Sequence, residues 1–231
     1  MGLRTVFTDH SLGSFNDAAM ISLNKVIKWL MGQVDASITV SQAGKDNLTL
    51  RASIAPDSIF VIPNAVNTSE FKPNPELQRP TNTINIVVVS RLAFRKGVDL
   101  LVDVIPSVLL KHPDVRFIIG GDGPKRDILE EMRDNYNLHD KVELVGDILP
   151  TDVHKVLCRG HIFLNTSLTE AFCIAILEAV SCGLLCVSTN VAGIPEVLPP
   201  ELVFLSPAEP KQIAEQVDIA INHYKKHGID H

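Results

Sequence analysis

The chain has 231 residues, of which 45% are hydrophobic and 21% are charged. That composition excludes wholesale disorder, a collagen-like repeat and a small disulfide-stapled scaffold. The formal net charge of −6 argues against a general nucleic-acid-binding protein, although a local basic pocket can still hold phosphate. We therefore expect no nucleic acid among the partners.

The chain has four cysteines, Cys158, Cys173, Cys182 and Cys186, which form no CxxC pair. No histidine lies at the spacing of a zinc finger. This usage predicts reduced, mostly buried thiols and no metal site. The most apolar window, residues 172–187, contains Glu178 and Gly183, so we expect a buried helix followed by a strand and not a membrane span.

Residues 1–62 read as part of an α/β domain. Strands are predicted at Thr5–Thr8, Ser37–Val40 and Ile59–Ile62, and helices at Asn16–Met31 and Gln42–Arg51. Three strands with two helices are too few to form a well-covered sheet, so we expect the C-terminal part of a Rossmann-like domain whose beginning is missing. Such a part should expose a sheet edge and apolar side chains. The proline-rich segment 63–81 is typical of an interdomain linker.

Residues 82–231 alternate short apolar runs with helical patterns. The runs are Ile84–Val89, Val115–Ile119, Lys141–Val145, His161–Leu164, Leu185–Ser188 and Leu202–Leu205. The helices are expected at Asp99–Lys111, Lys125–Tyr136, Thr151–Cys158, Ala171–Cys182 and Pro210–His227. Continuous apolar runs indicate strands buried on both faces, as in a parallel sheet covered by helices. We predict one complete, doubly wound, Rossmann-like α/β domain here.

Two loops of this domain follow strands and suit an anion. The first, Ser90–Gly97, contains Arg91 and Lys96, and a planar guanidinium with an ammonium suits a diphosphate. A solvated basic loop explains the same spacing equally well. The second, residues 120–124, contains Gly121 and Gly123, whose backbone can approach an anion at a helix N-terminus. A tight turn that needs positive φ is the alternative.

Two acids, Glu170 and Glu178, are separated by seven residues. Glu178 lies in an otherwise apolar helix, and burying an unpaired carboxylate is costly, so we expect it to face a cleft or accept hydrogen bonds. Sugar and ribose hydroxyls are suitable donors. Glu170 is expected in the loop or first helical turn, where simple capping is the alternative.

Two further segments are candidates with weaker support. His10 follows a predicted strand in Phe7–Ser11, and the adjacent Asp9, His10 and Ser11 point different ways, so they make no hydrolase triad. We expect His10 to line a cleft at most. The loop 191–196 either closes a pocket or is merely a turn.

Together these motifs resemble the retaining, nucleotide-sugar-dependent glycosyltransferases of the GT-B, family-4 type. Four longer runs, residues 5–11, 61–66, 117–126 and 160–173, resemble the members that transfer N-acetylglucosamine to phosphatidylinositol. The resemblance implies two Rossmann-like domains, the second binding UDP-N-acetylglucosamine (UDP-GlcNAc). It implies an enzyme that starts glycosylphosphatidylinositol (GPI) anchor synthesis with other subunits, at the cytosolic face of the endoplasmic reticulum membrane.

The resemblance also assigns roles to residues. Arg91 and Lys96 match the basic pair that holds the diphosphate and stabilises the leaving group. Glu178 matches the acid that binds the ribose hydroxyls, and Glu170 the acid near the transferred sugar. No metal and no cofactor are expected.

Three residues receive roles at the transferred sugar in the same way. Ala171 and Phe172 are expected to touch the nucleotide sugar through their backbone. His10 matches a first-domain histidine that faces the sugar in relatives. Retention without a firmly placed nucleophile is usually read as a front-face mechanism.

Two alternatives stay open, and a third is disfavoured. The family's first domain normally begins with a strand and a Gly-Gly turn, and members of the family also have a C-terminal membrane segment. We expect this chain to be a partial product that lacks both. It is then either catalytically competent or a donor-binding, inactive form that regulates or competes. A family-4 transferase with another donor or acceptor is the second alternative. A Rossmann dehydrogenase is disfavoured because GxGxxG with a following acid is absent.

Overall fold

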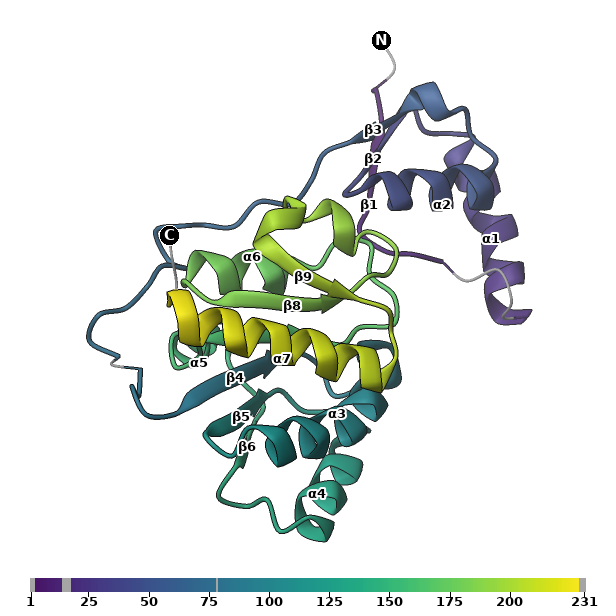
Figure 1. Cartoon of the computed structure of the whole chain (residues 1–231). Helices are drawn as coiled ribbons and strands as arrows, with labels where there is room; N and C mark the ends of the chain where they lie inside the picture. The colour runs from purple at the N-terminus through teal and green to yellow at the C-terminus, as the bar shows by residue number, and fades with distance from the viewer. Residues whose placement is uncertain (1–2, 14–17, 78, 229–231) are drawn as a thin grey trace. The chain divides into compact units, whose positions relative to one another are not determined.

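A computed structural model describes residues 3–13, 18–77 and 79–228 of the chain. The chain divides into two compact units (Figure 1). The smaller unit comprises Met1–Ala65, Thr169–Cys173 and Ala192–Val197. The larger unit comprises Val66–Leu168, Ile174–Val191 and Leu198–His231.

The smaller unit has a three-stranded parallel sheet in the order β1-β2-β3. Its elements are β1 (Val6–Asp9), α1 (Ala18–Met31), β2 (Ala36–Thr39), α2 (Gln42–Ala52) and β3 (Ile59–Val61). Met31, Leu48, Ala52 and Ile59 form its small core. Ser41 caps α2, because its hydroxyl accepts a hydrogen bond of 3.0 Å from the Gly44 amide.

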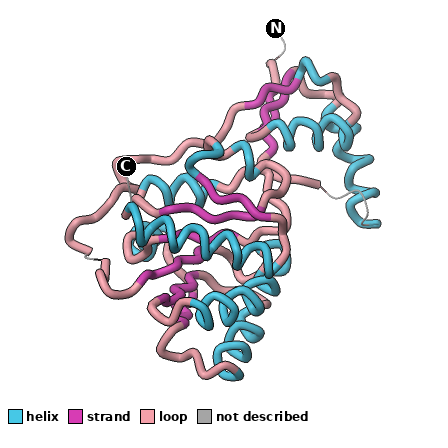
Figure 2. The backbone as a smooth tube through the Cα atoms, in the orientation of Figure 1, coloured by secondary structure: helices cyan, strands magenta, loops and turns pink. Residues whose placement is uncertain are grey.

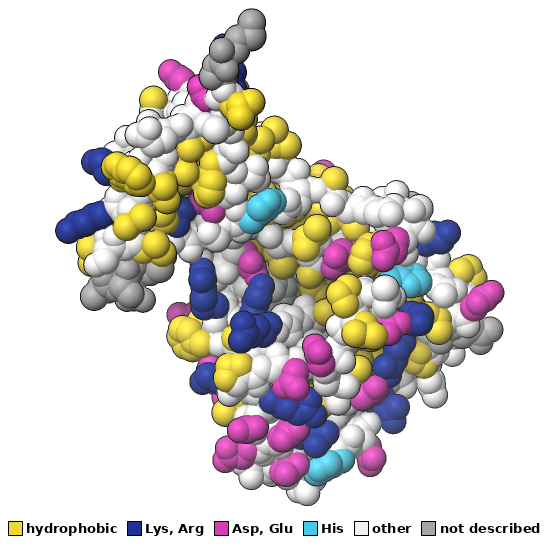
Figure 3. All heavy atoms as spheres, turned by 180° about the vertical axis from the view of Figure 1, so that it is seen from behind, with side chains coloured by type: hydrophobic (Ala, Val, Ile, Leu, Met, Phe, Trp, Pro, Cys, Tyr) yellow, Lys and Arg dark blue, Asp and Glu magenta, His cyan; other side chains and the backbone are white. Residues whose placement is uncertain are grey.

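Apolar side chains are exposed on the smaller unit, as the sequence predicted (Figure 3). Those of α1 are Ile21, Leu23, Val26, Trp29 and Leu30. Those of the edge strands are Val6 and Phe7 of β1 and Phe60 of β3, together with Ile62, which follows β3. Trp29 is 68% exposed. A patch of this kind is a site of association or an aggregation hazard.

The larger unit has a six-stranded, fully parallel sheet in the order β6-β5-β4-β7-β8-β9. Its strands are β4 (Ile84–Val89), β5 (Val115–Gly120), β6 (Val142–Gly146), β7 (Ile162–Asn165), β8 (Leu185–Thr189) and β9 (Val203–Ser206). Its helices are α3 (Val98–Lys111), α4 (Arg126–Asn135), α5 (Val153–Leu157), α6 (Ile174–Ser181) and α7 (Pro210–His227).

Helices cover both faces of this sheet (Figure 2). The main core joins α3, α4 and α7 to one face, and α5 and α6 lie on the other (Figure 1). All six predicted strands are present, and the doubly wound α/β prediction is confirmed. The order reverses direction between β4 and β7, which places a switch point where ligands of such sheets bind.

Two helices of the larger unit begin at least two residues later than predicted. The predicted helix Ala171–Cys182 begins at Ile174; residues 169–173 group with the smaller unit, where the Glu170 carbonyl accepts a hydrogen bond from the Gly193 amide. The predicted helix Thr151–Cys158 is a short 3₁₀ turn, Pro150–Asp152, followed by α5. Gly183 follows α6 with φ +77, the left-handed conformation that ends helices.

Arg79 helps to fasten the segment before β4 to the rest of the larger unit. The Arg79 guanidinium donates to the carbonyls of Gly183 at 2.9 Å and Cys182 at 2.7 Å, and more weakly to Cys158 at 3.4 Å. All four cysteines are buried, as predicted, and none of them forms a disulfide within the described residues. Within the described residues no helix is both long and apolar enough to cross a bilayer.

Candidate functional site

The loop after β4 and the glycine-rich turn after β5 are joined by backbone hydrogen bonds. The Leu92 amide donates to the Asp122 carbonyl, and the Lys125 amide donates to the Leu92 carbonyl, both at 2.9 Å. Gly121 has φ +121, and a Cβ there would lie 1.9 Å from the Ser90 carbonyl oxygen. The turn therefore needs glycine for its close approach as well as for its conformation.

The basic loop is also fastened to the segment after β7. Gly97 has φ +67, and a Cβ there would lie 1.8 Å from the Thr166 carbonyl oxygen. The Thr166 hydroxyl donates to the Lys96 carbonyl at 3.0 Å, and the Leu168 amide donates to the Arg95 carbonyl at 2.9 Å. These contacts fix the loop on both sides, so Arg91 and Lys96 lie on a rigid platform at the carboxyl ends of β4 and β7.

A pocket of 420 Å³ opens at the carboxyl ends of β4, β5 and β6. Its lining is Val89, Ser90 and Arg91, then Gly121 and Asp122, then Asp147, Ile148 and Val153. Arg91 is exposed, and its guanidinium has no hydrogen bond or ion pair with the described residues. The pocket thus combines an available cation, a glycine backbone and apolar walls, which is a suitable environment for a nucleotide.

Three of these lining residues, Asp147, Ile148 and Val153, were missed by the sequence reasoning. A usable signal existed, because Asp147 and Ile148 directly follow β6 and strand ends meet at one edge of a parallel sheet. The sequence alone does not show that β6 lies beside β5.

Three predicted residues of the larger unit lie outside the lining of this pocket. Lys96 ends the short 3₁₀ turn Phe94–Lys96 of the basic loop. Gly123 lies in the glycine turn, where its amide donates to the Asp122 carboxylate at 2.6 Å. Glu178 lies on α6, half-buried, and its carboxylate forms no hydrogen bond or ion pair with the described residues. Burial, followed by the nearby Glu70 carboxylate, raises the pKa of Glu178.

The smaller unit contains the other four predicted residues. His10 directly follows β1 and is exposed. Glu170, Ala171 and Phe172 lie in the segment Thr169–Cys173, where Ala171 and Phe172 are buried.

Buried polar groups hold the segment around His10. The Asp9 carboxylate pairs with Arg51 of α2 and accepts from the Ser11 amide at 3.0 Å. The Asn47 side chain accepts from the Gly13 amide and donates to the Gly13 carbonyl, both at 3.0 Å. Side chains of α2 therefore anchor the chain on both sides of His10, at Asp9 and at Gly13.

The loop 191–196 is bonded within the smaller unit. The Gly193 amide donates to the Glu170 carbonyl at 3.0 Å. The Glu196 carboxylate accepts from the amides of Gln42, at 2.5 Å, and Ala43, at 2.9 Å, at the start of α2. A carboxylate is favoured there because the first amides of a helix lack partners within the helix.

Among the described residues, no group of three or more His, Cys, Asp or Glu side chains is placed to hold a metal ion.

Comparison with known proteins gives the family. The model of glycosyl transferases group 1 matches residues 70–228, and that of glycosyltransferase family 4 matches residues 1–70. A subunit of the phosphatidylinositol N-acetylglucosaminyltransferase of Arabidopsis thaliana is 52% identical over 96% of this chain and 49% of its own length. The human protein of the same name is 52% identical over 97% of this chain and 46% of its own length.

The chain thus spans about half the length of the curated relatives it matches. Among solved structures, Anabaena HepE in complex with UDP and glucose is 21% identical, with a TM-score of 0.82 over 98% of this chain and 64% of that chain. This likeness shows the GT-B fold. With a family model matched along most of its length, the chain belongs to the glycosyl transferases group 1.

Proposed function

We propose that the chain carries the nucleotide-sugar-binding part of an enzyme that transfers N-acetylglucosamine from UDP-GlcNAc to phosphatidylinositol. The pocket with Arg91 and Gly121 at the carboxyl ends of β4, β5 and β6 is the observation that carries the proposal. The relatives at 52% identity supply the sugar and the acceptor by name. Their name also describes one part of a larger enzyme, which supports assembly with further subunits. We place that assembly at the cytosolic face of the endoplasmic reticulum membrane as part of the same proposal.

The proposed roles follow the chemistry of each group. Arg91 and Lys96 hold the diphosphate, while Gly121 and Gly123 let the backbone approach the nucleotide. Glu178 accepts hydrogen bonds from the ribose hydroxyls. The roles at the transferred sugar fall to the smaller-unit residues His10, Glu170, Ala171 and Phe172.

In the reaction we propose, the bond between C1 of N-acetylglucosamine and the β-phosphate oxygen of UDP breaks. An inositol hydroxyl oxygen forms the new bond to C1 on the same face, and its proton passes to the departing phosphate oxygen. The negative charge that develops on the diphosphate lies where Arg91 and Lys96 stabilise it, so removing them should slow transfer more than it weakens binding of the intact donor.

A transfer assay tests this function. The chain is incubated with UDP-GlcNAc carrying a tritiated sugar and with phosphatidylinositol vesicles, and labelled lipid is counted. Labelled lipid from the wild type, and none from Arg91→Ala/Lys96→Ala, supports the proposal. UDP-GlcNAc binding without labelled lipid would instead support the donor-binding, inactive form. Equal transfer to a different acceptor lipid would support another member of the family.

The Glu178→Gln variant should be more heat-stable than the wild type at pH 8 and bind UDP less tightly. The raised pKa of Glu178 means that the folded state disfavours the carboxylate. The resulting loss of folding stability is fully present above the raised pKa and absent at low pH, where both states are protonated. A neutral amide removes that cost but accepts ribose hydrogen bonds less strongly, by about fivefold to tenfold in affinity. Differential scanning fluorimetry with and without UDP measures both effects.

The matched control is Glu131→Gln, an exposed glutamate on α4. It should change neither the unfolding temperature nor UDP binding. If Glu178→Gln bound UDP as tightly as the wild type, Glu178 would have no role at the ribose.

A further inference from the structure

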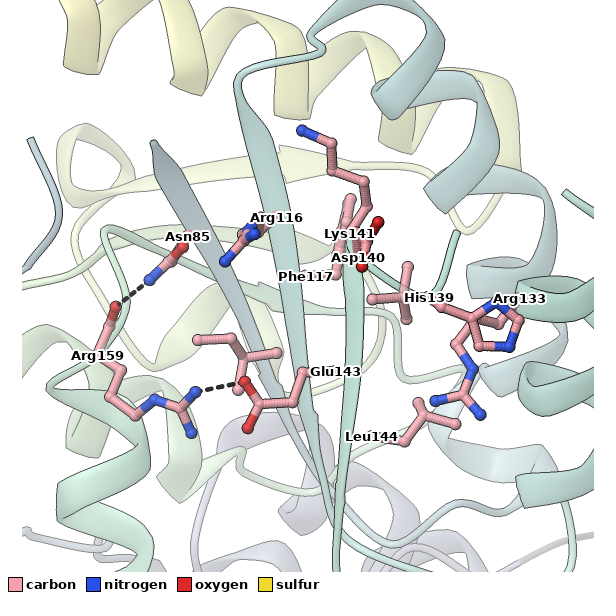
Figure 4. Close-up of a pocket in the computed structure, with 12 residues that line it drawn as sticks. Asn85, Arg116, Phe117, Arg133, His139, Asp140, Lys141, Glu143, Leu144 and Arg159 are labelled. Carbon is pink, nitrogen blue, oxygen red and sulfur yellow. Dashed lines mark hydrogen bonds and ion pairs between the residues drawn. The ribbon is translucent and has the colours of Figure 1, made fainter. Parts of the chain in front are cut away.

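A second polar pocket, of 460 Å³, lies at the opposite ends of the same strands (Figure 4). It is lined near the amino-terminal ends of β4 and β5 by Asn85 and Arg116, and along the start of β6 by residues 139–144. Arg133 of α4 and Arg159, which follows α5, complete its basic lining. No residue of this pocket lines the one that contains Arg91.

The cations of this pocket lie on both faces of the sheet. Phe117, Val142 and Leu144 pack toward the core shared with α3, α4 and α7. Side chains alternate along a strand, so Arg116 and Glu143 point to the other face, where Glu143 pairs with Arg159. Arg133 belongs to α4 and therefore lies on the core side.

The charge of the pocket is opposite in sign to that of the chain. Arg116, Arg133, Lys141 and Arg159 face two acids, Asp140 and Glu143, whereas the chain has a net charge of −6. The Arg116 guanidinium has no partner among the described residues. The buried Nε atom of Arg133 lacks a hydrogen-bond partner. Unsatisfied buried donors are costly, so the pocket is suited to an anionic group.

The strand that runs through the pocket is an edge strand. Within the part of the chain that the structure describes, β6 pairs with β5 only, so one side of its backbone has no strand neighbour there. Lys141, Val142, Glu143 and Leu144 all line the pocket, which borders this edge strand and also reaches β5 through Arg116 and β4 through Asn85. An extended peptide beside such an edge pairs with the backbone and directs alternate side chains to the two faces.

We propose that an extended, acidic segment of a partner protein binds here by adding a strand to β6. Its acidic side chains would reach Arg116 on one face and Arg133 on the other. A compact phosphate would reach only one face, which is why the arrangement favours an extended occupant. Edge strands are often protected by charges of their own, but these arginines lie beside the strand and attract an acidic neighbour.

Fluorescence anisotropy with the 231-residue chain tests the proposal at an ionic strength of about 0.1 M, where charges more than about 10 Å apart are largely screened. The probe is a fluorescein-labelled peptide of roughly ten residues, in which adjacent pairs of glutamate alternate with single valines. Binding to the wild type is expected, and Arg116→Glu should weaken it by about tenfold. Arg133→Glu should do the same if it folds, as judged by circular dichroism. The same peptide N-methylated at alternate residues should bind far more weakly, because it cannot pair along an edge.

The matched control is Lys211→Glu, an exposed position at the start of α7 that makes the same change in charge. It should alter binding by less than about twofold, as expected for a screened, distant charge. The proposal is overturned by absent binding, by equal binding of the N-methylated peptide, or by equal effects of Lys211→Glu and Arg116→Glu. Displacement of the peptide by millimolar inorganic phosphate, with the same dependence on Arg116, would identify a small-anion site and also overturn it.

Discussion

Gly97→Ala should lower the free energy of unfolding of the larger unit by about 3 kcal/mol and weaken UDP binding. Two causes add. The residue has φ +67, which is unfavourable for alanine, and its Cβ would lie 1.8 Å from the Thr166 carbonyl oxygen. That oxygen belongs to the backbone, so the basic loop must move to relieve the clash. Arg91 and Lys96 would then leave their positions on the platform.

The control for this variant is Gly228→Ala. Gly228 has φ +72, but a Cβ there meets nothing within 4 Å. Gly228→Ala therefore places alanine in an unfavourable backbone conformation without a clash. It should lower the free energy of unfolding by about 1 kcal/mol and leave UDP binding unchanged. Urea unfolding and UDP titration of both variants give the comparison. Equal losses in the two variants would show that the contact with Thr166 does not position the loop.

Acid should destabilise the larger unit through His161, by about 2 kcal/mol between pH 7 and pH 5. The imidazole is 1% exposed, and its Nδ1 accepts a hydrogen bond of 2.9 Å from the Asn85 amide. Burial, followed by the nearby Arg79 guanidinium, lowers the pKa of His161 to about 4. Nδ1 is an acceptor, so the folded state requires the neutral ring.

The direction of this change in stability follows from which state, folded or unfolded, binds the proton first as the pH falls. Above the unfolded pKa of 6.5 both states are neutral, and stability is complete. As the pH falls from there to about 4, only the unfolded chain takes up the proton, so stability is lost over that range. Below the folded pKa both states are protonated, and His161 adds no further loss.

His161→Asn should remove this part of the pH dependence, because its amide oxygen can accept from Asn85 but does not titrate. Urea unfolding at pH 7 and pH 5 measures the difference between wild type and variant. The control is His223→Asn, which replaces an exposed histidine on α7. The stability of this variant should depend on pH as that of the wild type does. If His161→Asn lost as much stability at pH 5 as the wild type, another group would carry the effect.

The fold was predictable because both the buried strands and the ends of the helices have recognisable patterns in the sequence. Runs such as Ile84–Val89 are apolar at every position but one, which only a strand covered on both faces requires. Glycines such as Gly183 then mark where helices end. The start of α6 was not predictable in this way. Ala171 and Phe172 are as apolar as the helix itself, but they belong to the smaller unit, and only tertiary contacts decide that.

The candidate site was predictable only in part. Loops that follow strands indicated Arg91 and Gly121 as candidates, and both line one pocket because parallel strands end at one edge. The sequence does not give the order of the strands, so the contribution of Asp147 and Ile148 was not seen. It also does not show that Gly97 touches Thr166, a contact between segments about seventy positions apart.

The most direct test of the account is a calorimetric titration of UDP-GlcNAc into the wild-type chain and two arginine variants, Arg91→Ala and Arg116→Ala. Both arginines are exposed and have no partner among the described residues, but only Arg91 lines the pocket at the carboxyl ends of the strands. We expect binding to the wild type, a loss of about thirtyfold or more with Arg91→Ala, and unchanged binding with Arg116→Ala. No binding by a folded wild-type chain, or equal losses in the two variants, would contradict a nucleotide-sugar site at this edge.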